Sequence, residues 1–474
     1  MQFFRKPSFF NTVTYAGLIA NILTLCEPGI GNLGAGGFGS VKAIAVANAL
    51  VYALMTVGIL LSAPIISYIG LKPVLILGCA FFCVCEWKIF IIAVTSDLSS
   101  SDGAALYYNS IAHNDGFLIG GSVLCGISAA AFWATEGTIF SSLPANEDRG
   151  RYLALWGVAK NLAPLALGGS ISLGFNVHSY ESGNVDPKVY IVFFSLMAAG
   201  FAIAFLFPNP SNIYRRDGTK VEMRQTDGLM TELTRTLKAF REPRVFLLLP
   251  LFFMSYFYYA YQSNYTSLYF NVRTRALSSF VSPFGAIISS VLMGFYLDSK
   301  RWSEKTKGIV MLAILFVCEM GLWTWIAVLR SIYGTQDAIG LDFDGASFVF
   351  NRAFPVVFFM NFVGQGSQNY LYWVVGHYAC GVNNLSTYVC ILRSAEACGQ
   401  TVAWAISQRV DVTSPVHIYI NFIGLFLSIL LAIPVVLKLQ YYEKDENEFV
   451  NYNVSDQESP RLSVDEKEKE KDSN

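Results

Sequence analysis

The sequence predicts an all-α membrane protein with twelve transmembrane helices arranged in two six-helix halves. Three observations predict this fold. Of the 474 residues, 54% are hydrophobic and 14% are charged, whereas soluble domains usually carry roughly 25% charged residues. The apolar residues come in blocks of about 20, the length that crosses a hydrocarbon core of ~30 Å. A polar stretch in the middle of the chain divides these blocks into two equal sets.

The apolar blocks define the boundaries of the predicted segments. They fall at about residues 9–33, 45–69, 73–94, 117–142, 152–176, 188–208, 244–270, 276–297, 308–330, 352–378, 385–408 and 415–438. We therefore predict an N-terminal half over 1–208, a linker over 209–243, a C-terminal half over 244–440 and a tail over 441–474. The tail is highly charged and poor in apolar residues, a composition typical of disordered chain.

The distribution of basic residues predicts the orientation of the helices. Lys and Arg are concentrated at the N-terminus, in the linker and in the connections on the same side of the predicted bundle. Such connections usually face the cytoplasm. Both termini and the linker are therefore predicted to be cytoplasmic, in a multi-pass protein of the lipid bilayer whose particular membrane the sequence does not identify.

Two tight basic turns occupy equivalent places in the two halves. The turn after the second helix contains Gly70 and Lys72, and the turn after the eighth contains Gly294, Asp298 and Arg301. A glycine lets two helices approach closely, and an aspartate at a helix end can bind N–H groups and basic residues of the next helix. Equivalent turns suggest two parallel halves, and transporters built in this way bind substrate between the halves.

The turn that contains Asp298 resembles the loop signature of the Major Facilitator Superfamily, Gly-x-x-x-Asp-(Arg/Lys)-x-Gly followed by basic residues. The first-half copy departs from this pattern, since Ser67 or Tyr68 stands where the acid is expected. A longer resemblance, to the Unc-ninety-three-like branch of this superfamily and its fungal members, is carried by Gly126–Gly137, Pro144, Glu147–Arg151, Trp156, Pro28-Gly29, Asn32–Gly37, Arg216–Thr219 and Gly399–Trp404. The resemblance implies the twelve-helix major facilitator fold. It implies no substrate, because the branch mixes presumed transporters with proteins that regulate channels or receptor trafficking.

Ionisable residues inside the apolar blocks are the informative candidates in the N-terminal half, because charge in hydrocarbon is costly and usually faces the bundle interior. Glu136 and Lys160 lie at a similar depth in consecutive helices, so we expect an ion pair between them. This pair either switches during function or statically locks the two helices. Glu86 is a further cavity candidate, whereas Lys88 points about 200° away from it on the third helix and is expected to snorkel outward.

The C-terminal half offers a candidate substrate cavity. Arg393 and Glu396 are spaced i,i+3 in the eleventh helix and can pair with each other. Further polar residues are Gln262 and Asn264, inside the aromatic run Tyr256–Tyr269, together with Asn361, Gln365, Gln368 and Asn369 on one stripe of the tenth helix. The candidate cavity comprises Gln262, Asn264, Gln365, Asn369, Arg393 and Glu396. The alternative is that these groups only join helices to one another.

These patterns favour a secondary transporter that moves a small solute by alternating access, with proton coupling as an open option. The rival hypothesis is a non-transporting regulator that binds a membrane-protein partner. The sequence predicts no enzyme, no cofactor and no metal site, because it contains no nucleophile–base constellation and no metal-ligand spacing. A Walker-type sequence is absent, which argues against ATP-driven transport. A basic face with interleaved aromatic residues is also absent, which argues against nucleic-acid binding.

Overall fold

The computed structural model describes residues 41–80, 115–142, 149–163, 169–178, 195, 198–205, 207, 229–333, 340–344, 348–378, 381–411 and 413–439. The described chain is helical, as the sequence predicts. The first predicted helix, Glu86, Lys88 and the tail over 441–474 lie outside the described residues.

The labelled helices follow the predicted blocks closely. They are α2 (Val41–Ile69), α5 (Asp115–Ser142), α6 (Arg149–Ala163), α7 (Ser170–Asn176), α9 (Leu229–Ala239), α10 (Pro243–Met254), α11 (Tyr258–Tyr269), α12 (Val272–Leu297), α13 (Glu304–Tyr333), α14 (Phe350–Tyr378), α15 (Gly381–Arg409) and α16 (Val416–Leu437). A further apolar helix covers Leu71–Ala80. The predicted linker range 209–243 contains α9, an amphipathic helix.

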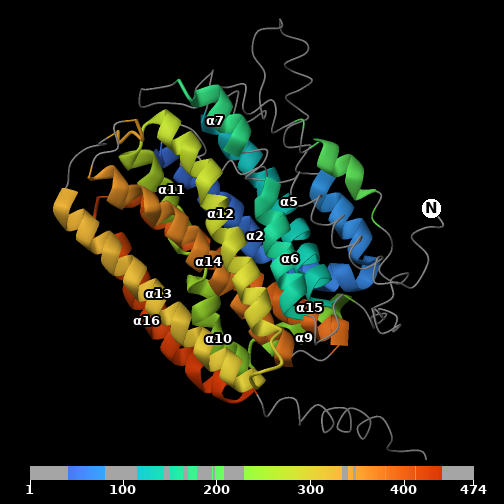
Figure 1. Cartoon of the computed structure of the whole chain (residues 1–474). Helices are drawn as coiled ribbons and strands as arrows, with labels where there is room; N and C mark the ends of the chain where they lie inside the picture. Colours follow the sequence, from blue (N-terminus) through green and yellow to red (C-terminus); the bar gives the residue numbers. More distant parts are fainter. Residues whose placement is uncertain are drawn as a thin grey trace, which may run out of the picture.

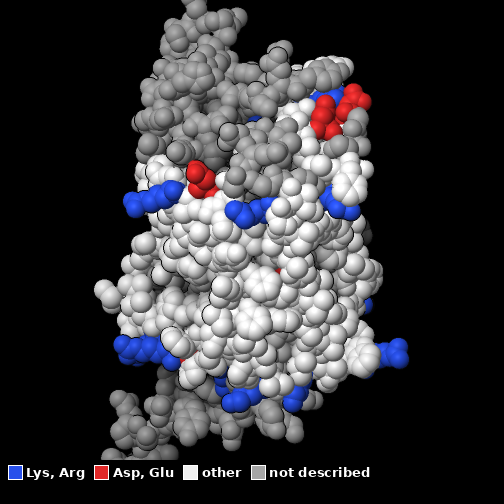
Figure 2. Space-filling view, turned by 90° about the vertical axis from the view of Figure 1, so that its left-hand side faces the viewer, with Lys and Arg blue, Asp and Glu red and all other residues white. Residues whose placement is uncertain are grey.

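Length and composition allow six of the described spans to cross a membrane. These are Ala45–Ile69, Gly121–Phe140, Pro243–Tyr269, Val272–Leu297, Glu304–Ile332 and Val416–Leu437. Figure 2 shows the matching surface, on which Lys and Arg gather at two levels and a band almost free of charge separates them. The helices α14 and α15 are each 29 residues long but more polar, because they carry the candidate site.

One predicted helix is interrupted within the described residues. The block 244–270 is divided into α10 and α11 by a turn at residues 255–257, where backbone N–H groups bond to carbonyls three residues back and Ser255 Oγ donates to the carbonyl of Phe252. Hydrogen bonds to the third residue back tighten the helix, and a serine hydroxyl competes with backbone N–H groups for a carbonyl. Both effects interrupt a regular α-helix. The block 152–176 is described as α6 up to Ala163 and α7 from Ser170, and residues 164–168 lie outside the described residues.

Helices from the two predicted halves pack directly on each other. The helix α2 packs against α15, and α12 packs against both α6 and α14. In Figure 1, α6, α12 and α14 run side by side through the middle of the molecule, while α13 and α16 lie together along one edge. Glycines permit this closeness, since a Cβ at Gly157 of α6 would collide with Ser290 of α12.

The buried apolar side chains form two large clusters, one toward each end of the bundle. One cluster includes Trp156, Leu297 and Trp373. The other includes Trp323 and Phe350. We call the end where α6 begins and α12 ends the Asp298 end, and the opposite end, where α12 begins, the Asp342 end. The candidate site lies between the two clusters.

Candidate functional site

Arg393 of α15 lies between two buried carboxylates. Its guanidinium donates to Glu396 Oε1 at 2.8 Å and to Glu136 Oε2 at 3.5 Å. The three side chains are almost completely buried, with at most 3% of each exposed. Because Glu136 belongs to α5 and Arg393 to α15, this contact joins the two halves electrostatically.

Aromatic rings surround the guanidinium of Arg393. Its Cζ lies 4.7 Å from the ring centroid of Trp133, 5.4 Å from that of Tyr372 and 5.8 Å from that of Trp156. The indole N–H of Trp156 donates to Glu136. Cations are attracted to ring faces at these distances, so the rings stabilise the buried positive charge and exclude water from it.

Lys160 of α6 supplies the second cation. Its Nζ lies 3.2 Å from Gln368 Oε1 and 3.3 Å from the hydroxyl of Tyr256. Gln368 in turn donates from Nε2 to both oxygens of Glu396 at 3.3 Å. We call Glu136, Lys160, Gln368, Arg393 and Glu396 the central charge network. Its formal charges balance, with two carboxylates and two cations.

The network adds a pairing that the sequence does not predict. Lys160 is the expected partner of Glu136, and the structure shows an ion pair of this carboxylate with Arg393, 257 positions away. Lys160 lies 5.0 Å and 5.3 Å from the ring centroids of Trp133 and Trp156, the same rings that surround Arg393. A direct ion pair between Glu136 and Lys160 stays a prediction. The sequence assigned these residues to separate sites because nothing in their spacing shows that α5, α6 and α15 converge.

The polar stripe of α14 continues the contact between the halves. Gln365 donates from Nε2 to Asn369 at 2.8 Å and accepts from Asn161 of α6 at 3.3 Å. Asn369 donates to Ser290 of α12 at 3.2 Å. Sequence reasoning missed Asn161, although its position next to Lys160 in an apolar helix was a usable signal.

Gln262 and Asn264 of α11 are buried, as expected, but stand apart from the network. Gln262 Oε1 and both side-chain polar atoms of Asn264 have no hydrogen-bond partner within the described chain. Buried polar groups are usually paired. By contrast, Gln365 pairs with Asn369 and Arg393 pairs with Glu396.

The turn after α12 joins the halves a second time, at the Asp298 end. Asp298 accepts hydrogen bonds from the backbone N–H groups of Gly150 and Arg151 at 2.7 Å and 2.8 Å. Its carboxylate also lies 3.5 Å from Arg151 Nε. From the sequence, Asp298 at the end of its helix can bind N–H groups and basic residues of the next helix; the structure shows it bound to the start of α6. A carboxylate satisfies the unpaired N–H groups of a helix N-terminus and its positive dipole.

The other residues of the two turns have local roles. Gly70 has a φ of +91°, a conformation that side chains disfavour. Lys72 Nζ donates to the carbonyl of Phe205 at 3.2 Å. Gly294 lets α12 approach Ala154 of α6 so closely that a Cβ would collide. Arg301 lies over the ring of Trp302, its Cζ 5.7 Å from the centroid.

Sequence reasoning also missed Glu319, a buried acid within the apolar helix α13. Its signal was visible, since it is the one carboxylate in the predicted block 308–330. Among the described residues, no group of three or more His, Cys, Asp and Glu side chains could hold a metal ion.

Comparison with known proteins gives a family and a fold. The sequence profile of the Major Facilitator Superfamily matches residues 8–403. The chain is 28% identical to the Notoamide biosynthesis cluster protein O' of Aspergillus versicolor, covering 93% of this chain and 94% of that protein. It is 27% identical to UNC93-like protein 1 of Arabidopsis thaliana, with 93% and 92% covered. An UNC93-like protein of Schizosaccharomyces pombe is 28% identical, with 92% and 84% covered.

Solved structures share the fold at low sequence identity. An outward-facing bacterial homologue of the iron transporter ferroportin superimposes with a TM-score of 0.59 at 12% identity, covering 90% of this chain and 99% of that one. The proton:xylose symporter XylE superimposes with a TM-score of 0.56 at 12% identity, with 91% and 96% covered. At these identities the likeness establishes the arrangement of helices alone.

Proposed function

Since the chain belongs to the Major Facilitator Superfamily, we propose that it is a secondary transporter that moves a small solute by alternating access between its two halves. The observation that carries this proposal is the central charge network. Glu136 of α5 forms an ion pair with Arg393 of α15, and Lys160 of α6 donates to Gln368 of α14, across the contact between the halves. Substrates of transporters built from two parallel halves bind at this interface near the bilayer midplane.

Buried charge pairs suit a reversible contact between halves. Their desolvation offsets most of their mutual attraction, so they stabilise a closed interface only weakly, yet leaving one charge unpaired costs about 3–5 kcal/mol. Each half therefore needs a partner for its charges whenever the interface opens. A solute that supplies the missing charge or hydrogen bonds favours the rearrangement.

The contacts of Arg393 support a preference for solutes with an anionic or carbonyl group. Its Nε has no hydrogen-bond partner within the described residues, although its other nitrogens contact Glu136 and Glu396. Guanidinium groups offer paired donors that match carboxylate and phosphate oxygens. Gln262 and Asn264 would add unpaired amide groups from α11, and Gln365 and Asn369 would add hydrogen bonds from α14.

The contacts at the Asp298 end support a state that is closed on the cytoplasmic side. Asp298 of the C-terminal half binds the start of α6, and Gly294 lets the two helices touch. The concentration of basic residues in the turns and the linker supports the cytoplasmic assignment of this end and of both termini.

A screen for transported solutes tests the proposal. Purified full-length protein in detergent is exposed to a panel of small anionic and neutral metabolites, and compounds that raise its thermal unfolding temperature are tested for uptake into proteoliposomes. We expect at least one compound to be taken up by the wild type and not by Arg393→Lys, which keeps the charge but loses the planar donor pair. Ser255→Ala serves as a matched control outside the network.

The rival function is a regulator that binds a membrane-protein partner, and the UNC93-like relatives leave it open. The two functions differ in the response to Arg393→Lys. If no stabilising compound is transported, while the wild type and Arg393→Lys retain the same membrane-protein partner after purification, the network is structural and the transporter proposal is wrong.

A further inference from the structure

We propose that Glu319 is a proton-binding site within the C-terminal half, separate from the central charge network, and that its proton is exchanged during the transport cycle. The binding site is argued from the surroundings of the carboxyl group. Its link to transport rests on the function proposed above, so the two claims are tested separately.

Glu319 lies near the middle of α13, on the face that packs into the bundle. Leu315 and Leu322 are buried on the same face, whereas Val317 is 68% exposed on the opposite face. Only 5% of Glu319 is exposed. Since α13 is long and apolar enough to cross a membrane, its middle lies about 20 Å from either end at 1.5 Å per residue. The carboxyl group is therefore deep in the hydrocarbon region.

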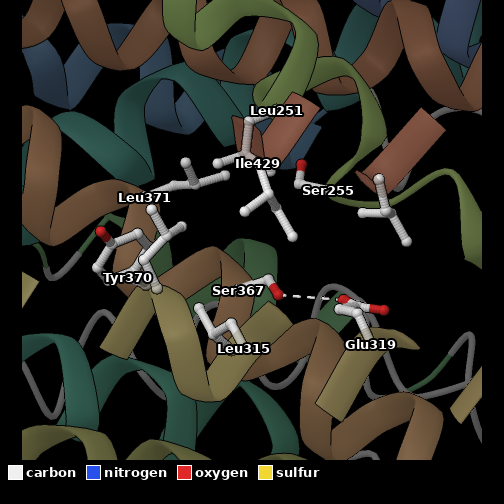
Figure 3. Close-up of a pocket in the computed structure, with 10 residues that line it drawn as sticks. Leu251, Ser255, Leu315, Glu319, Ser367, Tyr370, Leu371 and Ile429 are labelled. Atoms are coloured by element: carbon white, nitrogen blue, oxygen red, sulfur yellow. Dashed lines mark hydrogen bonds between the residues drawn. The ribbon is translucent and has the colours of Figure 1, made fainter. Parts of the chain in front are cut away.

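The carboxyl group borders a pocket between four helices, shown in Figure 3. The pocket is small, with room for about one water molecule. It is lined mainly by leucine and isoleucine side chains, with Ser255, Ser367 and Tyr370 as the other polar residues. Ser367 of α14 donates its hydroxyl to Glu319 Oε1 at 3.2 Å. The pocket is mostly apolar and has room for water. It contains few other groups that could stabilise a negative charge on Glu319.

Within the described part of the chain, no Lys, Arg or His pairs with Glu319. The ionisable groups around it are Cys318 beside it on α13, Tyr258 of α11 and Tyr370 of α14. The lining residues from α16, Leu425 and Ile429, are apolar. An isolated carboxylate in hydrocarbon costs several kcal/mol, and such a group instead takes up a proton. The surroundings therefore favour the neutral acid in this conformation.

A second donor is available for the ionised form. Trp323 lies one helical turn beyond Glu319, where residues i and i+4 are neighbours, and its indole N–H acts as a side-chain donor toward the same carboxyl group. When the carboxyl O–H bond breaks, the proton passes to a water molecule at the open side of the pocket and the carboxylate keeps the electron pair. Ser367 and Trp323 are then placed to donate to it.

The helix α14 connects this site to the central charge network. Ser367 donates to Glu319, and the next residue, Gln368, donates to Glu396 and accepts from Lys160. A change in charge at Glu319 acts on Ser367, and any rotation or shift of α14 at that point moves Gln368 as well. The proton on Glu319 can thus bias the contact between the halves without belonging to it.

Infrared spectroscopy tests the proton site directly. Difference spectra between acid and alkaline buffer are recorded on full-length protein in lipid nanodiscs, for the wild type, Glu319→Gln and Ser255→Ala. We expect the carbonyl stretch of one protonated carboxyl group to vanish in alkali in the wild type and in Ser255→Ala, which loses a hydroxyl from the same pocket. The band should be missing from Glu319→Gln. A band of equal size in Glu319→Gln overturns the proposal.

A second variant keeps the test valid if Glu319→Gln fails to fold. Ser367→Ala removes the hydrogen bond from Ser367 to Glu319 Oε1, so the same band should move to higher frequency; a band at the wild-type frequency overturns the assignment. Sodium or potassium added in alkali should leave the spectra unchanged. If either ion instead removes the acid band at a pH where the wild type is protonated, the ligand is a metal cation and the proposal is wrong.

The transport step is tested in proteoliposomes with a solute found by the screen. An imposed pH gradient should drive accumulation by the wild type, whereas Glu319→Gln should lose accumulation but keep exchange of labelled for unlabelled solute. Gradient-driven accumulation by Glu319→Gln overturns the coupling and leaves the transporter standing. If no solute is transported by the wild type, the proposed function fails, and the infrared band still decides whether Glu319 binds a proton.

Discussion

At the scale of single residues, Arg393 is the side chain on which the candidate site depends most. It contacts both buried carboxylates of the network and the rings of three aromatic residues. One of these contacts, to Glu396, is visible in the sequence because the two residues are one helical turn apart. The other, to Glu136, joins helices from different halves. Arg393 therefore links a local pair to a contact between halves.

Replacing Arg393 by Leu should lower the free energy of unfolding by about 3–5 kcal/mol, because it leaves two buried carboxylates with one cation. Adding Glu136→Gln should recover part of this loss, since it removes the stranded charge. The measurement is the thermal unfolding of purified protein in detergent. Adding Glu319→Gln to Arg393→Leu is the matched control, and it should recover nothing. Equal recovery by both second changes would show that Glu136 is not a partner of Arg393.

At the scale of elements, close contacts of helix backbones determine how α15 packs on the interrupted helix α10–α11. A Cβ at Gly399 of α15 would collide with the backbone carbonyl oxygen of Phe253 in α10. This contact lies beside the turn at residues 255–257 that carries Tyr256, a partner of Lys160. The position of the network thus depends on the absence of a side chain at Gly399.

Replacing Gly399 by Ala should lower the free energy of unfolding by about 1–3 kcal/mol, the usual effect of overpacking a buried contact. The matched control is Gly321→Ala in α13, where a Cβ meets nothing within 4 Å. Alanine is a better helix former than glycine, so the control should be neutral or stabilising by about 0.5–1 kcal/mol. The measurement is the thermal unfolding of Gly399→Ala and Gly321→Ala. Equal destabilisation of the two variants would mean that the contact with Phe253 is unimportant.

The loop at the Asp342 end ties α12 to the segment before α14. Arg273 donates from Nε to Asp342 Oδ1 at 2.7 Å, and Leu341 forms backbone hydrogen bonds with Tyr269 and Asn271. Partial burial raises the pKa of Asp342, but the hydrogen bonds and charge of Arg273 outweigh it, so the pKa lies below the usual value near 3.8. This carboxylate therefore stabilises the fold above its unfolded pKa, and the contribution is lost as the pH falls through the lower, folded value.

Replacing Asp342 by Asn should accordingly lower thermal stability at neutral pH, and the difference from the wild type should shrink in strong acid, where both side chains are neutral. Melting curves across this pH range test the expectation. Asp344→Asn, on the exposed neighbour that also contacts Arg273, should have a smaller effect at every pH. A difference between wild type and Asp342→Asn that is independent of pH would show that the carboxylate charge is not involved.

At the scale of the whole molecule, the two halves are joined at two levels. The central charge network joins them in the middle, and Asp298 joins them where α6 begins. Alternating access requires the contact at one end to open while the other closes. The contact at the Asp298 end uses backbone N–H groups and one carboxylate, and the neighbouring side chain of Arg151 is exposed to solvent. Opening this end would expose the Asp298 carboxylate, which is 7% exposed in the closed contact.

The orientation of the molecule is testable independently of transport. A reporter fused after Glu443 should be inaccessible to impermeant reagents from outside intact cells, because the distribution of basic residues predicts that both termini are cytoplasmic. A reporter inserted at residues 334–339, between α13 and α14, should be accessible. The reverse pattern would overturn the predicted orientation and with it the cytoplasmic assignment of the Asp298 end.

The sequence by itself determined the fold class, the membrane environment and the approximate ends of most helices. These follow from block length and hydropathy, which are local properties of the chain, and so does the pairing of Arg393 with Glu396 at i,i+3. The helices of the candidate site were also visible, since polar residues interrupt the apolar blocks of α14 and α15.

The tertiary structure alone decided which charged and polar groups contact one another. Glu136 contacts Arg393, Lys160 contacts Gln368, and Asp298 binds the start of α6, although each pair is separated by more than a hundred positions. No periodicity within one helix encodes such contacts, because they depend on which helix faces lie against each other. The sequence also does not show that Glu319 lacks a cationic partner among the described residues. It shows that an acid is present in α13, but only packing determines whether a cation lies beside it.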